Sequence, residues 1–349
     1  MKQYQDLIRE IREDGDLSQN RTGVDTIKID GAMMRFDLSA GFPAVTTKKL
    51  AFKSVVAELC AFLRASRSAV DFRALGCKVW DDNANGVGQV DADGKVVAPN
   101  PWLDNPFRKG PDDLGPIYGV QWREWPGYKF FDQPPSNAER DKMIKDGWEY
   151  LGPVGNYGNY DGELWHKQID QLGECLRTII KDPNNRRILF HGWNPAALDE
   201  VALPACHLLY QFLPNVTTGK LNMTIYVRSN DVDKGTPFNI AEAALFIEIF
   251  ARLAGMKPGR LTYFVGDAHI YNTSDAYLDE LLSKEPFPLP TLKIDDRIPS
   301  YDPTATGYTS HDDQIDHMVE WLRLIMPGDF ELVDYQHHTL ETPPAKMVI

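Results

Sequence analysis

The sequence lacks several features that membrane, secreted and nucleic-acid-binding proteins need. No apolar run approaches the roughly 20 residues that cross a bilayer. The start, MKQYQDLIREIREDGD, is charged and amphipathic and has no apolar core of a signal peptide. The net charge of −13 disfavours a general nucleic-acid-binding surface, so an anionic ligand requires a local cluster of arginines. We expect a cytoplasmic protein without membrane or direct nucleic-acid partners.

Cysteine is also scarce in this chain. Its 349 residues include four: Cys60, Cys77, Cys175 and Cys206. They form no C-x-x-C pair and fit no zinc spacing, so free thiols are the simplest interpretation. His337 and His338 are adjacent, but neighbouring side chains of an extended segment face opposite ways. We therefore predict no metal site.

Hydrophobic periodicity and turn residues divide the chain into helices and strands. Helices are predicted over 2–14, 51–66, 164–182, 239–256 and 312–326, and strands over 26–38, 186–194, 203–214, 220–231 and 260–271. The first strand surrounds a glycine turn, and the next two are apolar enough to be buried. Two segments, about 83–113 and 127–164, are expected to be long surface insertions. We expect a single α+β domain over 1–349 with 239–256 as its buried helix.

Cys206 lies in the apolar stretch LPACHLLYQF, where composition alone favours a buried filler residue. A reactive thiolate needs a nearby positive charge, and the strand-like segments supply Arg186, Arg187 and Arg228. Arginines beside apolar strands are costly unless they are paired or bind an anion. Cys206 is therefore a candidate nucleophile. His207 is its neighbour on a strand and points the other way, which disfavours a cysteine hydrolase.

Several polar residues of the later strands have two interpretations each. Arg228 and Ser229 suit phosphate oxygens, or they end a strand in solvent. Asn239 begins the buried helix, where it acts as a cap or reads the O4 and N3–H edge of uracil. His269 and Tyr271 alternate on one strand face, so they reach one ligand hydroxyl or form a satisfied core pair.

Six stretches resemble the thymidylate synthase family, which includes the pyrimidine hydroxymethylases. They are NRTGVDTIKIDGAMMRFDLSAGFPAVTTKKL (20–50), LGPIYGVQWREW (114–125), DPNNRRILFHGWNP (182–195), LPACHLLYQF (203–212), RSNDVDKGTPFNIA (228–241) and GDAHIY (266–271). They occur in the family order and span almost the whole chain outside the two insertions. The resemblance implies a central mixed sheet with a buried central helix, and an obligate homodimer that pairs through its sheet faces.

The resemblance also implies a reaction. The Cys206 thiolate would attack C6 of 2′-deoxyuridylate (dUMP) and make C5 a carbon nucleophile. C5 would take a one-carbon unit from the co-substrate 5,10-methylenetetrahydrofolate, and a base would remove the C5 proton. Hydride from the folate then gives a methyl group, whereas water gives a hydroxymethyl group. Relatives that use cytidylate carry aspartate at the place of Asn239, so this residue favours dUMP.

The resemblance assigns substrate contacts to residues from several motifs. These are Arg21, Arg228 and Ser229 for the phosphate, Arg186 and Arg187 for the phosphate in the partner subunit's site, Asn239 for the base, His269 and Tyr271 for the sugar 3′-hydroxyl, and Gln211 as a further contact. Arginines shared between two sites would make the homodimer obligatory for binding.

The same resemblance assigns a catalytic set. It comprises Cys206, Glu58, Tyr118, His207, Asp231 and Asn239. Glu58 would anchor a water network that moves protons around the base and the folate, Tyr118 would assist removal of the C5 proton, and His207 would organise the same network. A glutamate on an otherwise apolar helix face is costly unless it is used, which supports the role of Glu58.

The resemblance also assigns folate binding to a further set of residues. They are Lys48 for the glutamate tail, Trp80 and Phe238 for the walls, Asp231 for the pterin amino and N–H groups, Lys234 and Gly235 beside it, and Val348 in the C-terminal AKMVI. We expect that last segment to close over the bound pair and exclude water.

The departures from the family pattern surround the folate. Asn83 replaces a second tryptophan, Lys234 replaces a folate-facing leucine, and Thr273–Ser274 replace Asn-His. Hydride transfer needs a dry site, whereas hydroxymethylation needs an admitted water. The sequence therefore leaves open a thymidylate synthase and a dUMP hydroxymethylase, in a bacterial or phage-infected cell. A non-catalytic nucleotide-binding homologue is a third, remote alternative, which the intact catalytic set disfavours.

Overall fold

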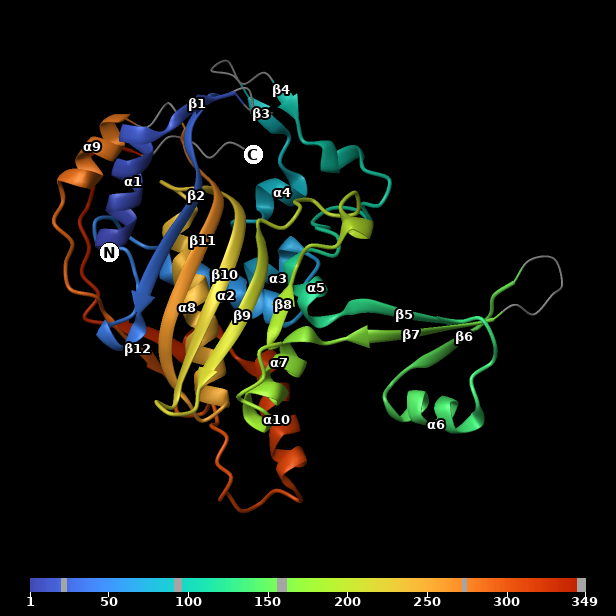
Figure 1. Cartoon of the computed structure of the whole chain (residues 1–349). Coiled ribbons are helices and arrows are strands. Elements are labelled where there is room, and N and C mark those ends of the chain that lie inside the picture. Colours follow the sequence, from blue (N-terminus) through green and yellow to red (C-terminus); the bar gives the residue numbers. More distant parts are fainter. Residues whose placement is uncertain (20–23, 91–95, 156–161, 272–274, 344–349) are drawn as a thin grey trace.

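The computed structural model describes residues 1–19, 24–90, 96–155, 162–271 and 275–343. Its centre is a sheet of six strands in the order β1-β2-β11-β10-β9-β8 (Figure 1). The strands are β1 (Asp16–Ser18), β2 (Thr26–Asp37), β11 (Lys257–Tyr271), β10 (Lys220–Asp231), β9 (His207–Asn215) and β8 (Leu189–His191). β10 and β11 are parallel and the other neighbours are antiparallel, so the sheet is mixed and the expected α+β class is confirmed.

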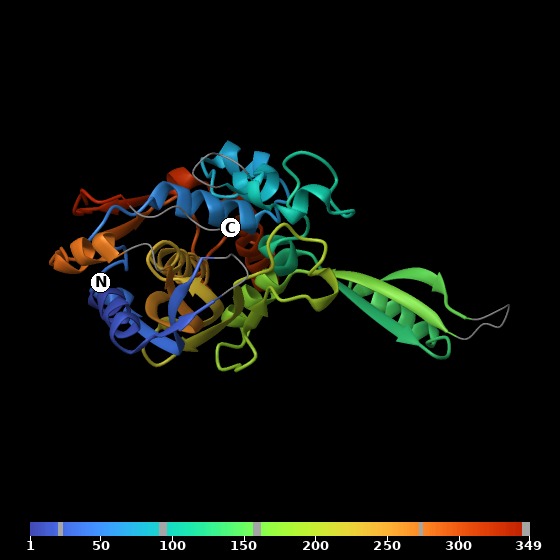
Figure 2. The same cartoon turned by 90° about the horizontal axis from the view of Figure 1, so that it is seen from above.

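Helix α8 (Thr236–Leu253) covers one face of this sheet, and helix α2 (Phe52–Leu63) packs against it (Figures 1 and 2). α8 begins with Pro237 in its first turn, where the missing N–H costs nothing, and it is buried on nearly all faces. It lies in the connection between β10 and β11. These two strands are parallel neighbours, and parallel neighbours can be joined only by a long crossover. The crossover places the turn at Asp231 and the start of α8 at the same end of the sheet.

The remaining helices surround this core. They are α1 (Lys2–Asp14), α3 (Ala69–Leu75), α4 (Asp81–Asn85), α5 (Tyr118–Arg123), α7 (Gln171–Lys181), α9 (Asp275–Ser283), α10 (His311–Leu324) and the short 3₁₀ helices η1 (Leu38–Ala40), η2 (Pro101–Asp104), η3 (Pro195–Ala197) and η4 (Pro327–Asp329). Two antiparallel strand pairs, β3 (Gly88–Val90) with β4 (Val96–Pro99) and β12 (Thr291–Ile294) with β13 (Phe330–Val333), complete the body. No helix of the described residues is long and apolar enough to span a bilayer.

The second predicted insertion forms an arm that projects from the body in both views (Figures 1 and 2). It consists of β5 (Trp125–Phe131), α6 (Asn137–Lys145), β6 (Glu149–Pro153) and β7 (Glu163–Ile169), with the strand order β5-β7-β6. Trp165 and Met143 are buried in it, and Arg140 forms an ion pair with buried Glu163. The arm therefore has a small core of its own.

Three predictions about local structure need correction. The helix predicted over 164–182 is wrong in its first part, because 164–169 pair with β5 and helix α7 begins only after the Asp170 cap. The strand over 26–38 has no turn, since Gly31 adopts a φ of 81° within continuous β2. The strands over 186–194 and 203–214 are not buried on both faces, because Leu189 and Leu209 are exposed.

The exposed side of β8 and β9 belongs to a larger apolar surface. Met33, Phe264, Tyr226 and Leu209 lie opposite one another on β2, β11, β10 and β9, in adjacent register positions. Their side chains are all exposed, with relative exposures of 37–47%. We call these four residues the sheet-face row. Helix α8 covers the opposite face, so the sheet has one buried side and one open apolar side.

Candidate active site

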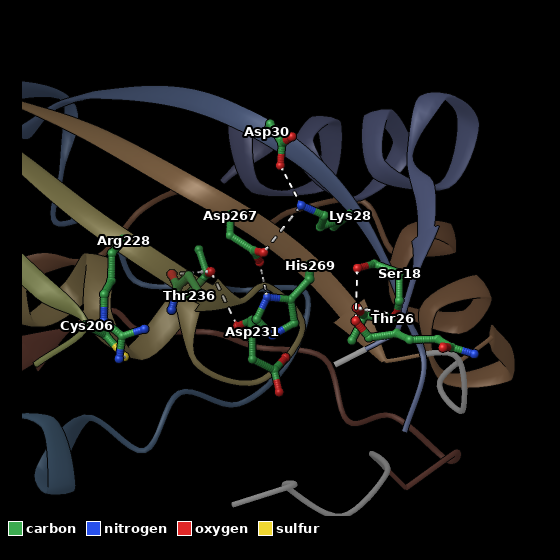
Figure 3. Close-up of polar contacts among 12 residues, drawn as sticks. Ser18, Thr26, Lys28, Asp30, Cys206, Arg228, Asp231, Thr236, Asp267 and His269 are labelled. Carbon is green, nitrogen blue, oxygen red and sulfur yellow. Dashed lines mark hydrogen bonds and ion pairs between the residues drawn. The ribbon is translucent and has the colours of Figure 1, made fainter. Parts of the chain in front are cut away.

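Cys206 lies immediately before β9, and the guanidinium of Arg228 is beside its thiol (Figure 3). Arg228 Nη2 is 3.5 Å from Cys206 Sγ. The guanidinium is held in place because Nε donates to the Ala205 carbonyl at 2.8 Å and Nη2 donates to the Pro204 carbonyl at 3.1 Å. The thiol beside this fixed positive charge is partly exposed, so a substrate can reach it.

Tyr118 supplies a phenol at the same cysteine. Its ring is buried at the start of α5, and its hydroxyl oxygen accepts the Cys206 backbone N–H at 2.7 Å. Burial raises the pKa of Tyr118 well above its usual value of about 10. The phenol is therefore protonated at neutral pH and is available to pass on a proton next to the nucleophile.

Glu58 and Trp80 form a buried pair near the Tyr118 ring. Trp80 Nε1 donates to Glu58 Oε1 at 2.7 Å, and the Trp80 and Tyr118 ring centroids are 5.9 Å apart. Burial raises the pKa of Glu58 to about 7. A carboxyl group with this pKa both accepts and releases protons near neutral pH. Trp80 was predicted to line the folate, and here its indole N–H is used by Glu58.

Glu242 on α8 was missed by the sequence reasoning. Its carboxyl group is buried, is hydrogen-bonded to that of Glu58, and lies 3.8 Å from His207 Nδ1. The signal was nevertheless present, because the immediate neighbours of Glu242 in α8 are apolar, as are those of Glu58 in α2. The same argument about the cost of a buried glutamate applies to both residues.

His207 and Asn239 connect this cluster to the start of α8. His207 is buried, is hydrogen-bonded to Asn239, and has its Nδ1 3.1 Å from the Tyr210 hydroxyl oxygen. Burial lowers the pKa of His207 to about 4, so the ring is neutral at neutral pH. Asn230 Nδ2 donates to Asn239 Oδ1 at 3.0 Å, which fixes the amide that was predicted to read the base.

Asp231 ends β10 and faces Lys234 and Lys48. The Lys234 backbone N–H donates to Asp231 Oδ1 at 3.2 Å, and Lys234 Nζ lies 3.7 Å from Oδ2. Within the described residues Oδ2 is buried and accepts no hydrogen bond. Burial, followed by the neighbouring carboxyl of Asp233, raises the pKa of Asp231 to about 8. Lys48 Nζ donates to the backbone carbonyl of Asp233, so this side chain braces the same turn.

His269 and Tyr271 do lie together near the end of β11, with ring centroids 5.5 Å apart. His269 Nδ1 is 2.6 Å from Asp267 Oδ1, and this hydrogen bond lowers the pKa of Asp267. Lys28 Nζ lies 3.8 Å from Asp267 Oδ2 (Figure 3). Asp267 was another residue that the sequence reasoning did not single out, and the contact orients the His269 ring.

The remaining predicted residues occupy three kinds of position. Arg186 and Arg187 are exposed just before β8, and Gln211 Nε2 donates to the Arg186 carbonyl at 3.1 Å. Ser229 and Phe238 are partly buried, and a Cβ on Gly235 would lie 3.2 Å from both Asn230 Nδ2 and the Asp231 carbonyl oxygen. Arg21, Val348 and the Thr273–Ser274 departure lie outside the described residues.

Neither adjacent histidine is grouped with acidic or thiol ligands. His337 Nδ1 and His338 Nε2 each lie within hydrogen-bonding distance of a backbone carbonyl, at 3.0 Å and 2.8 Å. Across the ranges that the structure describes, no three His, Cys, Asp or Glu side chains are placed to hold a metal ion.

The fold and the site bring a partly exposed cysteine thiol together with an arginine and a buried phenol, a combination that suits an enzyme with a cysteine nucleophile. Comparison with known proteins identifies the family. The Thymidylate synthase family model matches residues 2–348, and the chain belongs to this family. Thymidylate synthases of Bordetella parapertussis and Pseudomonas putida are each 49% identical to it, over 344 and 345 residues, with 99% of both chains covered. That of Pseudomonas syringae pv. tomato is 47% identical over 344 residues, again with 99% coverage of both chains.

Proposed function

We propose that this chain catalyses the thymidylate synthase reaction, in which dUMP and 5,10-methylenetetrahydrofolate give thymidylate and dihydrofolate. The observation that carries the proposal is the contact between Cys206 and Arg228, beside the buried Tyr118 phenol. Family membership and the near-complete coverage of relatives named thymidylate synthase support the same reaction.

Cys206 and Tyr118 carry the first steps of the proposed mechanism. Cys206 Sγ adds to C6 of the pyrimidine, which turns C5 into the nucleophile, and Arg228 stabilises the thiolate before the attack. The folate supplies the one-carbon unit and the hydride, and the Sγ–C6 bond breaks when the hydride is transferred, which frees the Cys206 thiolate. Glu58, whose pKa lies near 7, takes up and returns protons, and Tyr118 passes on the proton removed from C5. His207 stays neutral and holds Asn239.

Asn239, His269 and Tyr271 position the nucleotide in this proposal. The Asn239 amide reads the uracil edge, because Asn230 and His207 fix its orientation from two sides. His269 and Tyr271 bind the sugar hydroxyl, and Asp267 holds the His269 ring. Arg21, Arg228 and Ser229 bind the phosphate, with Gln211 as a further contact.

Asp231 is the anchor for the pterin. A buried carboxylate oxygen that accepts no hydrogen bond from the described residues fits a ligand with amino and N–H donors. In this proposal Gly235, Phe238 and Trp80 are walls of the folate site, and Lys48 and Val348 are its further contacts. Lys48 already donates to the Asp233 carbonyl, so its contact with a glutamate tail would require that side chain to turn outward.

The sheet-face row is the proposed dimer interface. Monomeric proteins rarely leave a contiguous apolar surface of this kind open, and a second copy offers a matching surface through a two-fold axis. The exposed Arg186 and Arg187 stand at the β8 edge of the same sheet, from which they reach the partner's phosphate. The four free cysteines suit the reducing cytoplasm of a bacterial cell.

Hydroxymethylation is the less favoured reaction. Lys234, which replaces a folate-facing leucine, pairs with Asp231 and lies 5.0 Å from the centre of the Tyr271 ring. These contacts explain the lysine without a catalytic water. The named relatives are thymidylate synthases, and no observation points to a hydroxymethylated product.

Product analysis tests the proposal. The protein is mixed with dUMP and 5,10-methylenetetrahydrofolate, the nucleotides are separated by mass, and dihydrofolate is followed by its absorbance. We expect thymidylate and dihydrofolate in equal amounts. Hydroxymethyl-dUMP with retained tetrahydrofolate would instead mean that water wins the last step. Binding of dUMP without tritium release from C5 would mean a non-catalytic homologue. Cys206→Ser is the matched control, and it should bind dUMP while losing turnover by several orders of magnitude.

A further inference from the structure

The two buried carboxyl groups Glu58 and Glu242 have no cationic partner among the described residues. Glu58 is 6% and Glu242 is 1% exposed, and they come from the packed helices α2 and α8. No lysine or arginine of the described residues lies within ion-pair distance of either carboxyl group. Two adjacent carboxylates cannot both ionise in such a place, because burial and mutual repulsion oppose the second charge.

The groups that pack around the pair are neutral as well. His207 is uncharged at neutral pH because burial lowers its pKa to about 4. Burial raises the pKa of the surrounding hydroxyl and thiol groups, which belong to Tyr118 on α5, Tyr210 on β9, Tyr263 on β11 and Cys77 after α3. Nothing in this shell therefore compensates a second negative charge.

The hydrogen bonds distinguish the two carboxyl groups. Glu58 accepts the Trp80 indole N–H at 2.7 Å, which stabilises its ionised form. Glu242 receives no such donor from the described residues, and its Oε1 is buried without a hydrogen-bond partner. The pair retains one proton. This proton therefore belongs on Glu242, whose O–H donates a hydrogen bond to Glu58. The pKa of Glu242 is raised well above its usual value, in the same direction.

We propose that Glu242 is a positioning residue whose protonated carboxyl group donates a hydrogen bond to Glu58 and keeps Glu58 ionised and oriented for proton transfer. The proposal rests on the catalytic role of Glu58 in the proposed function. Glu242 lies three positions after Asn239, so both residues are on the same face of α8. In this proposal that face both reads the base through Asn239 and controls the protonation of Glu58 through Glu242.

Two substitutions separate hydrogen bonding from ionisation. Glu242→Gln keeps an N–H donor toward Glu58 but cannot ionise, whereas Glu242→Leu removes the donor at similar size. Tritium release from C5 of dUMP should change little in Glu242→Gln at neutral pH. In Glu242→Leu, loss of the donor raises the pKa of Glu58, so the acidic limb of the rate profile moves up by about one pH unit and release at neutral pH falls about fivefold.

A matched control comes from the same helix. Glu248 is partly buried on α8, and burial raises its pKa to about 7, but it is not among the groups that interact with Glu58. Glu248→Gln and Glu248→Leu should leave the pH profile of tritium release unchanged. If Glu242→Leu folds and has the wild-type profile, or if Glu242→Gln and Glu242→Leu lose rate equally without a shift, the proposal is wrong.

Infrared spectroscopy tests the pair without any turnover. The difference spectrum between the wild type and Glu242→Gln at neutral pH should contain one carbonyl band of a protonated carboxylic acid that the variant has lost, apart from the bands of Asp231 and Glu248, which both proteins share. Glu58→Gln should retain this band, because the proton resides on Glu242. If the band persists in Glu242→Gln, the assignment of the proton is overturned. If the band behaves as expected but the protein releases no tritium, the proposed function fails while the pair stands.

Discussion

The guanidinium of Arg228 touches the sulfur of Cys206. At the same time it donates hydrogen bonds to the backbone carbonyls of Pro204 and Ala205, the two residues directly before Cys206. The cation on β10 is therefore tied to the loop that carries Cys206, and its position does not depend on a bound ligand. This preorganised contact gives the first prediction.

Replacing Arg228 by leucine should slow alkylation of Cys206 at neutral pH by about tenfold or more, because the thiolate loses its charge partner. The measurement is the rate of iodoacetamide labelling, followed by peptide mass. The other cysteines, Cys60, Cys77 and Cys175, should stay unlabelled in the folded protein, since burial raises the pKa of each to about 12. Arg260→Leu, at an exposed position of β11, is the control, and equal slowing in both variants would contradict the prediction.

Folate binding should become tighter as the pH rises toward about 8. Asp231 is protonated below its raised pKa in the free protein, and a ligand that donates N–H groups needs the carboxylate, so binding below that pH must release a proton. The measurement is the dissociation constant of a folate in the presence of dUMP across this range. Asp231→Asn should bind weakly and lose most of the pH dependence, and an unchanged slope would place the responsible proton elsewhere.

The Glu242→Gln variant should lose less stability than the wild type as the pH rises. The folded-state pKa of Glu242 is raised above the unfolded value, so its contribution to stability is complete below the unfolded pKa and is lost as the pH rises toward the folded pKa. Each pH unit in that window costs the wild type about 1.4 kcal/mol that the glutamine variant does not lose. Melting temperatures at matched protein concentration check this. Parallel pH dependences of the two proteins would rule it out.

Tyr226→Glu should weaken the proposed dimer. This side chain lies in the centre of the sheet-face row, between Phe264 and Leu209, and a charge buried there in the interface would have no partner. Sedimentation at micromolar concentration should show monomers, with turnover lost in parallel. The control is Tyr128→Glu on the projecting arm, where 61% of the side chain is exposed. A variant that remains dimeric would exclude the sheet-face row as the interface.

Local patterns in the sequence were sufficient for most of the body. The helices predicted over 2–14, 51–66, 239–256 and 312–326 and the strands over 220–231 and 260–271 are confirmed within a few residues. Their periodicity is a property of neighbouring residues, so it can be read without knowing what they pack against. The family resemblance is confirmed for the same kind of reason, since its motifs are short and keep their order.

Long-range pairing decided what local patterns could not. Residues 164–169 are a strand because β5 and β6 pair with them on both sides, although their own spacing suits a helix. The partner of Glu58 could not be identified from the sequence, because Glu242 reaches it only after α8 packs against α2. The residue types were set by the sequence alone. Which charges became neighbours, and where the proton between them resides, was decided by burial in the tertiary structure.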